Sequence, residues 1–243
     1  MDFALQLWSI NEELEMDFYG TFEKVAKMGY AGVEFAGYGG KSAKELKSKL
    51  DEYGLSVAGS HVPLDRLKNS LQEEIEYNLE IGNKFLVCPR AEFSRRDDVY
   101  ELIDILNNAA SEAKKHGLIL AYHNHAREFE KIDGEYILDL LIKHVPDLAL
   151  EIDVFWVKYA GLDPVKYIKQ CGDRASLVHL KQINGDKKNV DFSDGVIDMF
   201  EIISASKYAK HFIVEQEKAT SAPMLSAKRN LEWMIEDILK KDN

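Results

Sequence analysis

The sequence has few cysteines and no long apolar run. Its two cysteines among 243 residues, Cys88 and Cys171, are too few for a disulfide framework and lack the spacing of a metal site. We expect them to be buried thiols in a reducing compartment. No stretch of about 18 apolar residues is present, which argues against a membrane-spanning helix. The opening residues, MDFALQLWSINEELE, lack the basic and apolar regions of a signal peptide, so we expect a cytoplasmic protein.

Positive charge is also scarce. The chain has 31 Lys and Arg against 42 Asp and Glu, a net charge of −11, and no basic stripe stands out beyond Arg95–Arg96. Such a protein repels the nucleic-acid backbone, so we expect no nucleic-acid partner. A glycine-rich nucleotide turn is missing after the first apolar run, where the chain reads WSINEELEMD. No linker or low-complexity segment divides the chain, which predicts one domain over residues 1–243.

Short apolar runs alternate with amphipathic stretches from end to end. The stretch SAKELKSKLDEYG, for example, opens with a capping box of Ser42 and Glu45 and ends at Gly54. Successive runs start roughly 24 to 35 residues apart, the spacing of one strand and one helix. Eight such units followed by a C-terminal helix over 226–241 predict an α/β fold, a single-domain (β/α)₈ TIM barrel. The expected strands are 3–8, 31–36, 55–61, 84–89, 118–125, 148–153, 176–181 and 211–217.

Polar side chains stand at the ends of the last four expected strands. In a TIM barrel the strand ends at the carboxyl side form the site, and alternate side chains point into the barrel. Two carboxylates buried in apolar strand ends need a cation or several donors. Together with imidazoles they predict a site for one divalent ion, since mixed nitrogen and oxygen ligation suits Mn²⁺, Co²⁺, Zn²⁺ or Fe²⁺. The residues are His123, His125, Asp153, His179, Lys181, Glu215 and Glu217.

At these positions the chain resembles the sugar phosphate isomerase/epimerase superfamily of xylose-isomerase-like, metal-dependent TIM barrels. The similarity runs along essentially the whole chain, through LQLWS, GYAGVEFAGYGGKSAKELK, LDEYGLSVAGSHV, AYHNHAREFE, EIDVFWVKYAGLDPV, LVHLKQ, VIDMF and IVEQ. The AYHNH segment is similar to one branch of this superfamily.

The resemblance implies that Asp153, His179 and Glu215 are metal ligands. The epimerases of the superfamily place a glutamate on strand five, and here His123 stands at the matching position. We therefore expect His123, rather than His125, to complete the ligand set. The missing glutamate puts a symmetrical two-glutamate epimerisation in doubt. Gln182, where relatives often have aspartate, speaks against a further carboxylate there.

These residues suit abstraction of a proton next to the carbonyl of a sugar, keto-sugar or cyclitol. A metal that polarises the carbonyl stabilises the enediolate, and a positioned base takes the proton. Glu215 is the first candidate for the base, with His125 and Glu128 as second candidates. Lys181 could stabilise the enediolate oxygen or form a salt bridge. Return of the proton gives isomerisation or epimerisation, whereas loss of a β-hydroxyl or glycosyloxy group gives dehydration or elimination.

Further residues are candidates for substrate contact. Glu34 and His61 could bind sugar hydroxyls or be polar strand ends satisfied within the protein, and Glu151 is expected to support Asp153 from one layer deeper. Trp8, Trp156 and Phe35 are expected to form an apolar wall or to belong to the core. Two other functions are compatible with such a barrel, an endonuclease-IV-like phosphodiesterase and a non-catalytic sugar-binding barrel. The expected partner is a small sugar or cyclitol, and a homo-oligomer is compatible with the sequence.

Overall fold

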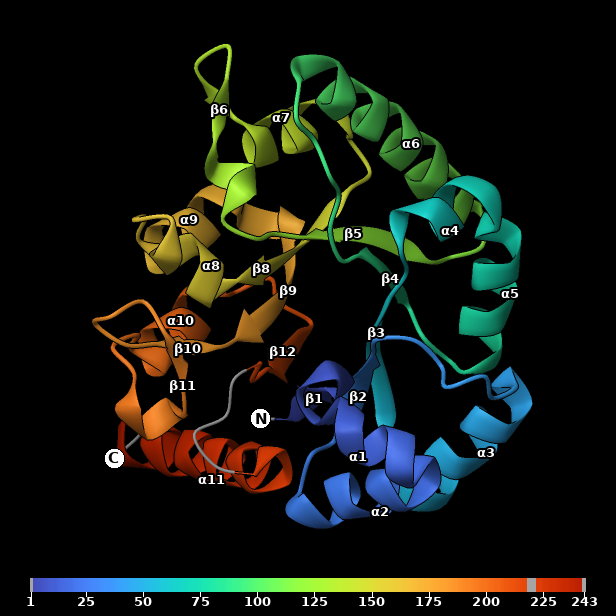
Figure 1. The fold of residues 1–243 in the computed structure, drawn as a ribbon, viewed down its shortest axis with the longest axis vertical. Helices are drawn as coiled ribbons and strands as arrows, with labels where there is room; N and C mark the ends of the chain where they lie inside the picture. The colour runs from blue at the N-terminus through green and yellow to red at the C-terminus, as the bar shows by residue number, and fades with distance from the viewer. Residues whose placement is uncertain (1, 218–221, 242–243) are drawn as a thin grey trace.

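A closed barrel of eight parallel strands forms the centre of the computed structural model, which describes residues 2–217 and 222–241 and, for 237–241, the backbone alone (Figure 1). Neighbouring strands follow the order β1, β12, β9, β8, β5, β4, β3, β2, so the sheet closes on itself without a free edge. The eight runs expected from the sequence all form strands, which confirms the TIM barrel. Their bounds are β1 Phe3–Gln6, β2 Gly32–Phe35, β3 Ser56–His61, β4 Phe85–Cys88, β5 Ile119–His123, β8 Ala149–Asp153, β9 Ala175–Leu180 and β12 His211–Val214.

Helices surround the barrel as an outer ring (Figure 1). The capping box expected at Ser42 and Glu45 is present at the start of α3, and Gly54 ends that helix in a left-handed conformation. The α-helices are α1 Asn11–Met16, α2 Phe18–Met28, α3 Ala43–Tyr53, α4 Leu64–Asn69, α5 Leu71–Glu80, α6 Arg96–Lys115, α7 Ile137–His144, α8 Val154–Tyr159, α9 Pro164–Cys171, α10 Met199–Ala205 and α11 Pro223–Lys241. Across the described part of the chain, no helix is long and apolar enough to span a membrane.

Shorter elements lie in the loops. They are the 3₁₀ helices η1 Leu7–Ile10, η2 Arg127–Phe129, η3 Gly172–Arg174 and η4 Phe192–Asp194, and the two-stranded sheets of β6 Lys131–Ile132 with β7 Glu135–Tyr136 and of β10 Gln182–Ile183 with β11 Asn189–Val190.

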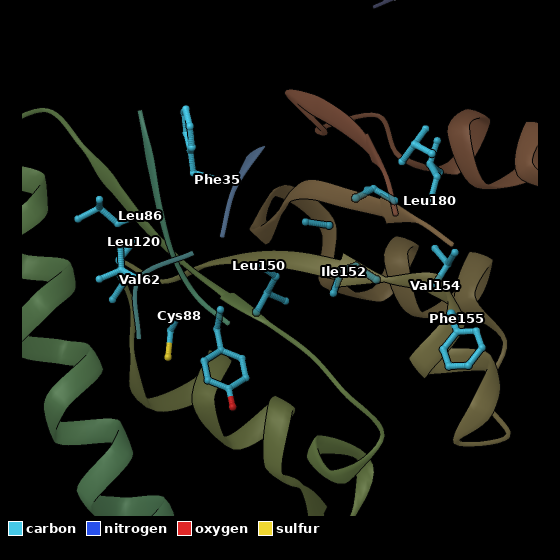
Figure 2. Packing of buried hydrophobic residues seen from close by; sticks show 14 of the residues in the cluster. Phe35, Val62, Leu86, Cys88, Leu120, Leu150, Ile152, Val154, Phe155 and Leu180 are labelled. Carbon is cyan, nitrogen blue, oxygen red and sulfur yellow. The ribbon is translucent and has the colours of Figure 1, made fainter. Parts of the chain in front are cut away.

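The alternation of side chains along each strand divides the apolar residues into two cores. Residues such as Leu150 and Ile152 point outward and pack with the helices (Figure 2). The opposite face fills the barrel floor with small and branched residues, among them Ala121, Leu177 and Ile213. The inward-facing residues nearer the carboxyl ends of the strands are polar. They therefore lie directly above this packed apolar layer. Both Cys88 and Cys171 are buried and free, as expected.

The observed strands end earlier than the apolar runs that predict them. β1 stops at Gln6 because its side-chain oxygen accepts a hydrogen bond from the Trp8 backbone N–H at 2.9 Å and starts η1. β5 stops at His123, so His125 lies beyond the strand and the alternation rule does not apply to it.

We expect Leu177→Ala in the barrel floor to lower the free energy of unfolding by about 2–5 kcal/mol, because Leu177 is fully buried and the closed sheet cannot collapse into the cavity. Leu225→Ala in α11, where the side chain is 42% exposed, is the matched control and should change it by less than about 0.5 kcal/mol. Urea denaturation measures both values. Equal losses in the two variants would contradict the floor packing described here.

Candidate functional site

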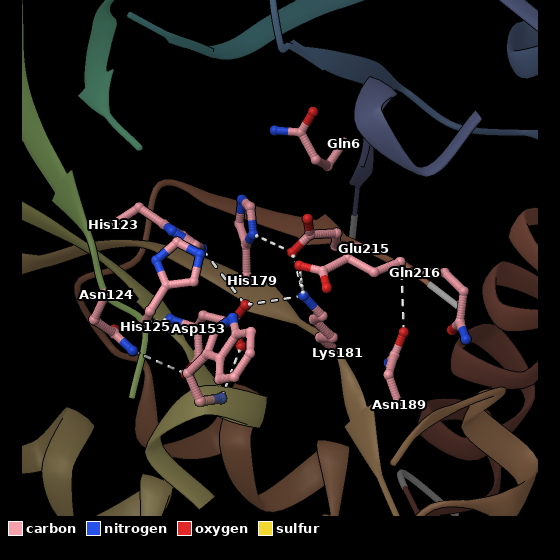
Figure 3. Close-up of polar contacts among 12 residues, drawn as sticks. Gln6, His123, Asn124, His125, Asp153, His179, Lys181, Asn189, Glu215 and Gln216 are labelled. Atoms are coloured by element: carbon pink, nitrogen blue, oxygen red, sulfur yellow. Dashed lines mark hydrogen bonds and ion pairs between the residues drawn. The ribbon is translucent and has the colours of Figure 1, made fainter. Parts of the chain in front are cut away.

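Four strands bring a set of titratable side chains together at the carboxyl end of the barrel. Strand pairing aligns Asp153 with His179 and His123 with Glu151, and Glu215 directly follows β12. One donor atom from each of His123, Asp153, His179 and Glu215 lies within 4.8 Å of the others, a spacing that could hold a metal ion. We call these four residues the outer group. Figure 3 shows them turned toward one another beside Lys181.

Two atoms of the outer group are buried without a hydrogen-bond partner in the described part of the chain. They are His123 Nε2 and Asp153 Oδ2, which lie 3.4 Å apart. Unpaired polar atoms are costly in a protein interior, so these two atoms are candidates to bind a ligand. The remaining two members face each other, with His179 Nδ1 at 3.1 Å from Glu215 Oε2.

Neighbouring groups fix the unpaired atoms. His123 Nδ1 lies 3.1 Å from the Pro89 carbonyl, which can only accept, so Nδ1 carries the proton and Nε2 presents its lone pair. Asn124 clamps the backbone of Asp153 with one bond from the Asp153 N–H at 3.1 Å and one to its carbonyl at 3.3 Å. Asp153 Oδ1 then accepts from the Trp156 N–H and caps α8, which leaves Oδ2 for the site.

A second layer of polar residues lies beneath the outer group and holds His179. His179 Nε2 is 2.7 Å from Glu34 Oε2 and 3.2 Å from Glu151 Oε2. Glu34 is positioned by a 2.6 Å bond from Gln6, and Glu151 by His61 at 2.9 Å. Carboxylates that bind the far nitrogen of an imidazole fix its orientation and raise its basicity.

Glycine at position 59 makes room for this layer. A Cβ at Gly59 would lie 2.5 Å from Glu34 Oε1, closer than side-chain atoms approach. A side chain there would push Glu34 off His179, so the close approach of β3 to Glu34 requires glycine.

The charges in the two layers shift one another strongly. Burial alone lowers the pKa of His179, but Glu151 and Glu34 outweigh it and hold the pKa well above its usual value. For Glu215, burial raises the pKa, but Lys181 and His179 outweigh it and keep it well below its usual range. Of the two deeper carboxyls, burial and the neighbouring Glu151 raise the pKa of Glu34, whereas His179 and His61 lower that of Glu151 despite burial.

Lys181 places a positive charge beside the outer group. Its ammonium lies 3.2 Å from Glu215, 2.5 Å from Glu217 and 3.7 Å from Asp153, and it sits 5.4 Å from the centre of the Trp156 ring. The side chain is fully buried, yet the three carboxylates outweigh the burial and raise its pKa. Lys181 therefore keeps its proton at neutral pH and acts as a fixed positive charge.

His125 packs beside the outer group rather than in it. Its ring centre lies 4.9 Å from that of His123 and 5.2 Å from that of Trp156. Burial and the neighbouring His123 lower the pKa of His125 to about 3. The ring is therefore neutral at pH 7 and is suited to exchanging hydrogen bonds with a ligand.

One sequence-based expectation needs correction, that for Glu128, and the structure decides between the alternatives left open for Glu34 and Phe35. Glu128 was expected near the mouth as a base, but its carboxylate accepts from the Tyr122 hydroxyl at 2.9 Å and the His125 N–H at 2.8 Å, which places it outside the barrel interior. Glu34 is a polar strand end satisfied within the protein, since it is fully buried beneath the site and bonded to Gln6 and His179. Phe35 belongs to the core, with its ring 6.0 Å from that of Phe22.

A cavity of about 550 Å³ opens above the outer group. This size lies within the range of roughly 300–1,000 Å³ that is typical of small-molecule sites. Trp8 and Trp156, for which an apolar wall and a core position were the alternatives, line it together with His61, His123, His125, Glu215 and Glu217. Gln6 and Asn124 were not expected from the sequence. The signal for Asn124 is its place directly after β5, next to the end of the neighbouring strand that carries Asp153.

Comparison with known proteins agrees with the barrel fold. A family model described as "Xylose isomerase-like TIM barrel" matches residues 22–237. An inosose dehydratase of Geobacillus kaustophilus (strain HTA426) is 27% identical, over 88% of this chain and 85% of the relative. A solved sugar phosphate isomerase/epimerase from Parabacteroides distasonis ATCC 8503 has a TM-score of 0.86 at 24% identity, covering 97% of this chain and 98% of that one. The structure of the IOLI protein with a binding zinc atom has a TM-score of 0.78 at 14% identity, covering 99% of each chain.

The raised pKa values of His179 and His61 predict how the stability of the metal-free protein depends on pH. A histidine whose pKa is higher in the folded than in the unfolded protein stabilises the folded state. This stabilisation is complete below the pKa of the unfolded protein, about 6.5, and is lost as the pH rises toward the pKa of the folded protein. Stability in EDTA should therefore fall above pH 6.5, by at most about 1.4 kcal/mol per pH unit for each proton. Urea unfolding between pH 6 and pH 9 measures this slope.

His61→Gln should make the slope shallower, because one of the two protons is removed. His211→Gln is the control, since burial lowers the pKa of His211, so its contribution to stability does not fall as the pH rises. A flat profile for the unmodified protein would contradict the charge arrangement described for the deeper layer.

Proposed function

We propose that this chain, which belongs to the xylose isomerase-like TIM barrel family, is a metal-dependent enzyme that removes a proton next to the carbonyl group of a sugar, keto-sugar or cyclitol and eliminates a group from the neighbouring carbon. The observation that carries the proposal is the convergence of one donor atom from each outer-group residue within 4.8 Å. Two of the four residues contribute buried polar atoms that lack a hydrogen-bond partner among the described residues.

The donor set fits one divalent cation. Two carboxylates, Asp153 and Glu215, balance a charge of 2+, and His123 and His179 add nitrogen ligands, a mixture suited to Zn²⁺, Mn²⁺, Co²⁺ or Fe²⁺. The zinc atom in the IOLI structure, which shares the fold, is consistent with this assignment. On metal binding, His179 would lose the proton on Nδ1, while Glu34 and Glu151 would remain in contact with Nε2.

The side chains at the carboxyl end of the barrel have different roles in the proposed reaction. A bound divalent cation would supply Lewis-acid polarisation of the substrate carbonyl. Glu215 is ionised and serves as the base that takes the proton from the carbon next to the carbonyl. Lys181 stays protonated and stabilises the negative charge that develops on the substrate oxygen. His125 is neutral and donates or accepts hydrogen bonds with substrate hydroxyls.

The residue on β5 favours elimination over epimerisation. Epimerisation needs a second base on the opposite face of the carbon, and His123 stands where a carboxylate would serve. His123 Nδ1 is tied to the Pro89 carbonyl and Nε2 belongs to the donor set, so no nitrogen of this ring is free to act as a base. Elimination needs only one base, and removal of a proton and a β-hydroxide releases one water. One relative is named inosose dehydratase, and a dehydratase catalyses an elimination of this type.

We expect Asp153→Asn to abolish stoichiometric binding of a divalent metal, because an amide removes one negative charge and one anionic oxygen from the outer group. Asp163→Asn is a matched control. Both aspartates cap a helix, α8 and α9 respectively, and asparagine caps equally well. Elemental analysis after loading with Zn²⁺ or Mn²⁺ should give about one metal per chain for Asp163→Asn and close to none for Asp153→Asn. Retention of the metal by Asp153→Asn would contradict the assigned site.

The reaction is tested by a screen of inososes, ketoses and 3-keto-glycosides in D₂O with the metal-loaded protein. We expect loss of the proton next to the carbonyl and formation of an unsaturated ketone. NMR and ultraviolet absorbance measure these two changes. Glu215→Gln should lower the rate by about 10²–10⁴-fold, with metal content measured in parallel to separate loss of the base from loss of the metal. Exchange of the proton without elimination would instead support an isomerase.

A further inference from the structure

Glu217 is the nearest of the three carboxylates around Lys181, and it has no role in the proposed reaction. Its Oε1 lies 2.5 Å from the Lys181 ammonium, whereas Glu215 Oε2 and Asp153 Oδ2 lie 3.2 Å and 3.7 Å from it. The Glu217 side chain is 32% exposed, while the side chains of Asp153 and Glu215 are buried. Asp153 and Glu215 belong to the outer group and Glu217 does not. The carboxylates that contact Lys181 are therefore of two kinds.

Lys181 and a divalent cation would compete for the same oxygen atoms. The ammonium faces Asp153 Oδ2, which has no hydrogen-bond partner among the described residues, and Glu215 Oε2, which also faces His179. A divalent cation bound by the outer group would neutralise both carboxylates and would repel the ammonium beside them. Of the three carboxylates in ion-pair distance of Lys181, Glu217 alone would then still compensate its charge.

The surroundings of Lys181 offer little compensation besides these carboxylates. Its side chain is fully buried, and its ammonium lies 5.3 Å and 5.4 Å from the centres of the Phe155 and Trp156 rings. Among the described residues, the ammonium donates hydrogen bonds to Glu215 and Glu217. An aromatic face attracts a cation more weakly than a carboxylate does, and a buried charge that loses its partner is strongly destabilising. Glu217 therefore matters most when a metal occupies the outer group.

The small sheet of β10 and β11 holds Glu217 against Lys181. The Asn189 side chain on β11 accepts a hydrogen bond from the Glu217 N–H at 2.9 Å and donates one to the Gln182 carbonyl at 2.9 Å (Figure 3). Gln182 directly follows Lys181 in the chain. One side chain thus ties together the backbone beside both members of the ion pair. This arrangement keeps Glu217 in place independently of the outer group.

We infer that Glu217 is the permanent counter-ion of Lys181 and that this ion pair allows the outer group to bind a divalent cation. In the metal-free protein, Lys181 compensates Asp153 and Glu215 as well as Glu217. When the outer group holds a cation, Glu217 keeps the ammonium compensated and in position. Glu217 is a positioning residue, because it acts through Lys181 and is not a metal ligand. This inference rests on the metal site of the proposed function and adds a residue outside the ligand set that controls its affinity.

The test is the affinity for Zn²⁺ of the unmodified protein and of Glu217→Gln, Lys181→Met and the double variant, measured by competition with a chromophoric chelator. Glu217→Gln should raise the Kd by about tenfold or more, because metal binding would leave a buried ammonium without a carboxylate partner. Lys181→Met should lower the Kd by about tenfold, because the competing cation is removed. The double variant should match Lys181→Met within about threefold, because Glu217 then has no ammonium to compensate.

A carboxylate that does not contact Lys181 provides the control. Glu92 is exposed on the loop after β4 and pairs with Arg90 and Arg127, so Glu92→Gln should change the Kd by less than about threefold. Urea unfolding in EDTA checks that each variant is folded. Should Glu217→Gln not fold, the two variants that contain Lys181→Met still decide, because a Kd more than about threefold higher in the double variant would overturn the inference.

The outcomes separate this inference from the proposed function. Equal weakening by Glu217→Gln with and without Lys181 would show that Glu217 acts as a general negative charge and would overturn the inference. An unchanged Kd in Glu217→Gln would also overturn it, while the proposed function would stand. Absence of stoichiometric Zn²⁺ binding by the unmodified protein would overturn the proposed function and this inference together.

Discussion

The excess of buried negative charge at the mouth of the barrel is the constraint on which the site depends. Glu34, Glu151, Asp153 and Glu215 are buried, and within the described chain Lys181 is the only lysine or arginine in ion-pair distance of any of them. Carboxylates in such surroundings are unstable unless protons or a cation compensate them. In the metal-free protein, the raised pKa values of His179 and His61 favour protonated rings that do so. A divalent ion would replace part of that charge and would bind Asp153 Oδ2, which has no hydrogen-bond partner among the described residues.

The barrel makes this concentration of charge possible. Its closed hydrogen-bonded strands leave no edge, and its floor of Ala121, Leu177 and Ile213 excludes water from below. Each strand contributes one or two inward side chains at a fixed height, so residues far apart in sequence become neighbours without any flexible loop. The deeper layer then orients the outer one, since Gln6 holds Glu34 and Glu34 holds His179. Rigid support of this kind keeps catalytic groups in place before the substrate arrives.

Much of this arrangement could be predicted from the sequence. Apolar runs at regular spacing gave all eight strands, and the alternation of side chains placed Asp153, His179 and Glu215 on one inward-facing set. Prediction failed where a side chain bonds to its own loop. Glu128 turns back to Tyr122 and the His125 backbone, and Gln6 starts a 3₁₀ turn, because hydrogen bonds formed after the strand ends decide these orientations. Glu34 could be assigned to the inward face, but its depth depends on the tilt and stagger of the strands, which periodicity does not encode.

The most direct test of the central claim is the position of a metal in crystals of the protein loaded with Zn²⁺ or Mn²⁺, located by anomalous diffraction. A single strong peak is predicted within about 2.0–2.3 Å of donor atoms of Asp153, His179, Glu215 and His123. A peak among Glu34, His61 and Glu151, whose donor atoms also lie close enough for a metal, or no peak in the barrel at all, would contradict it.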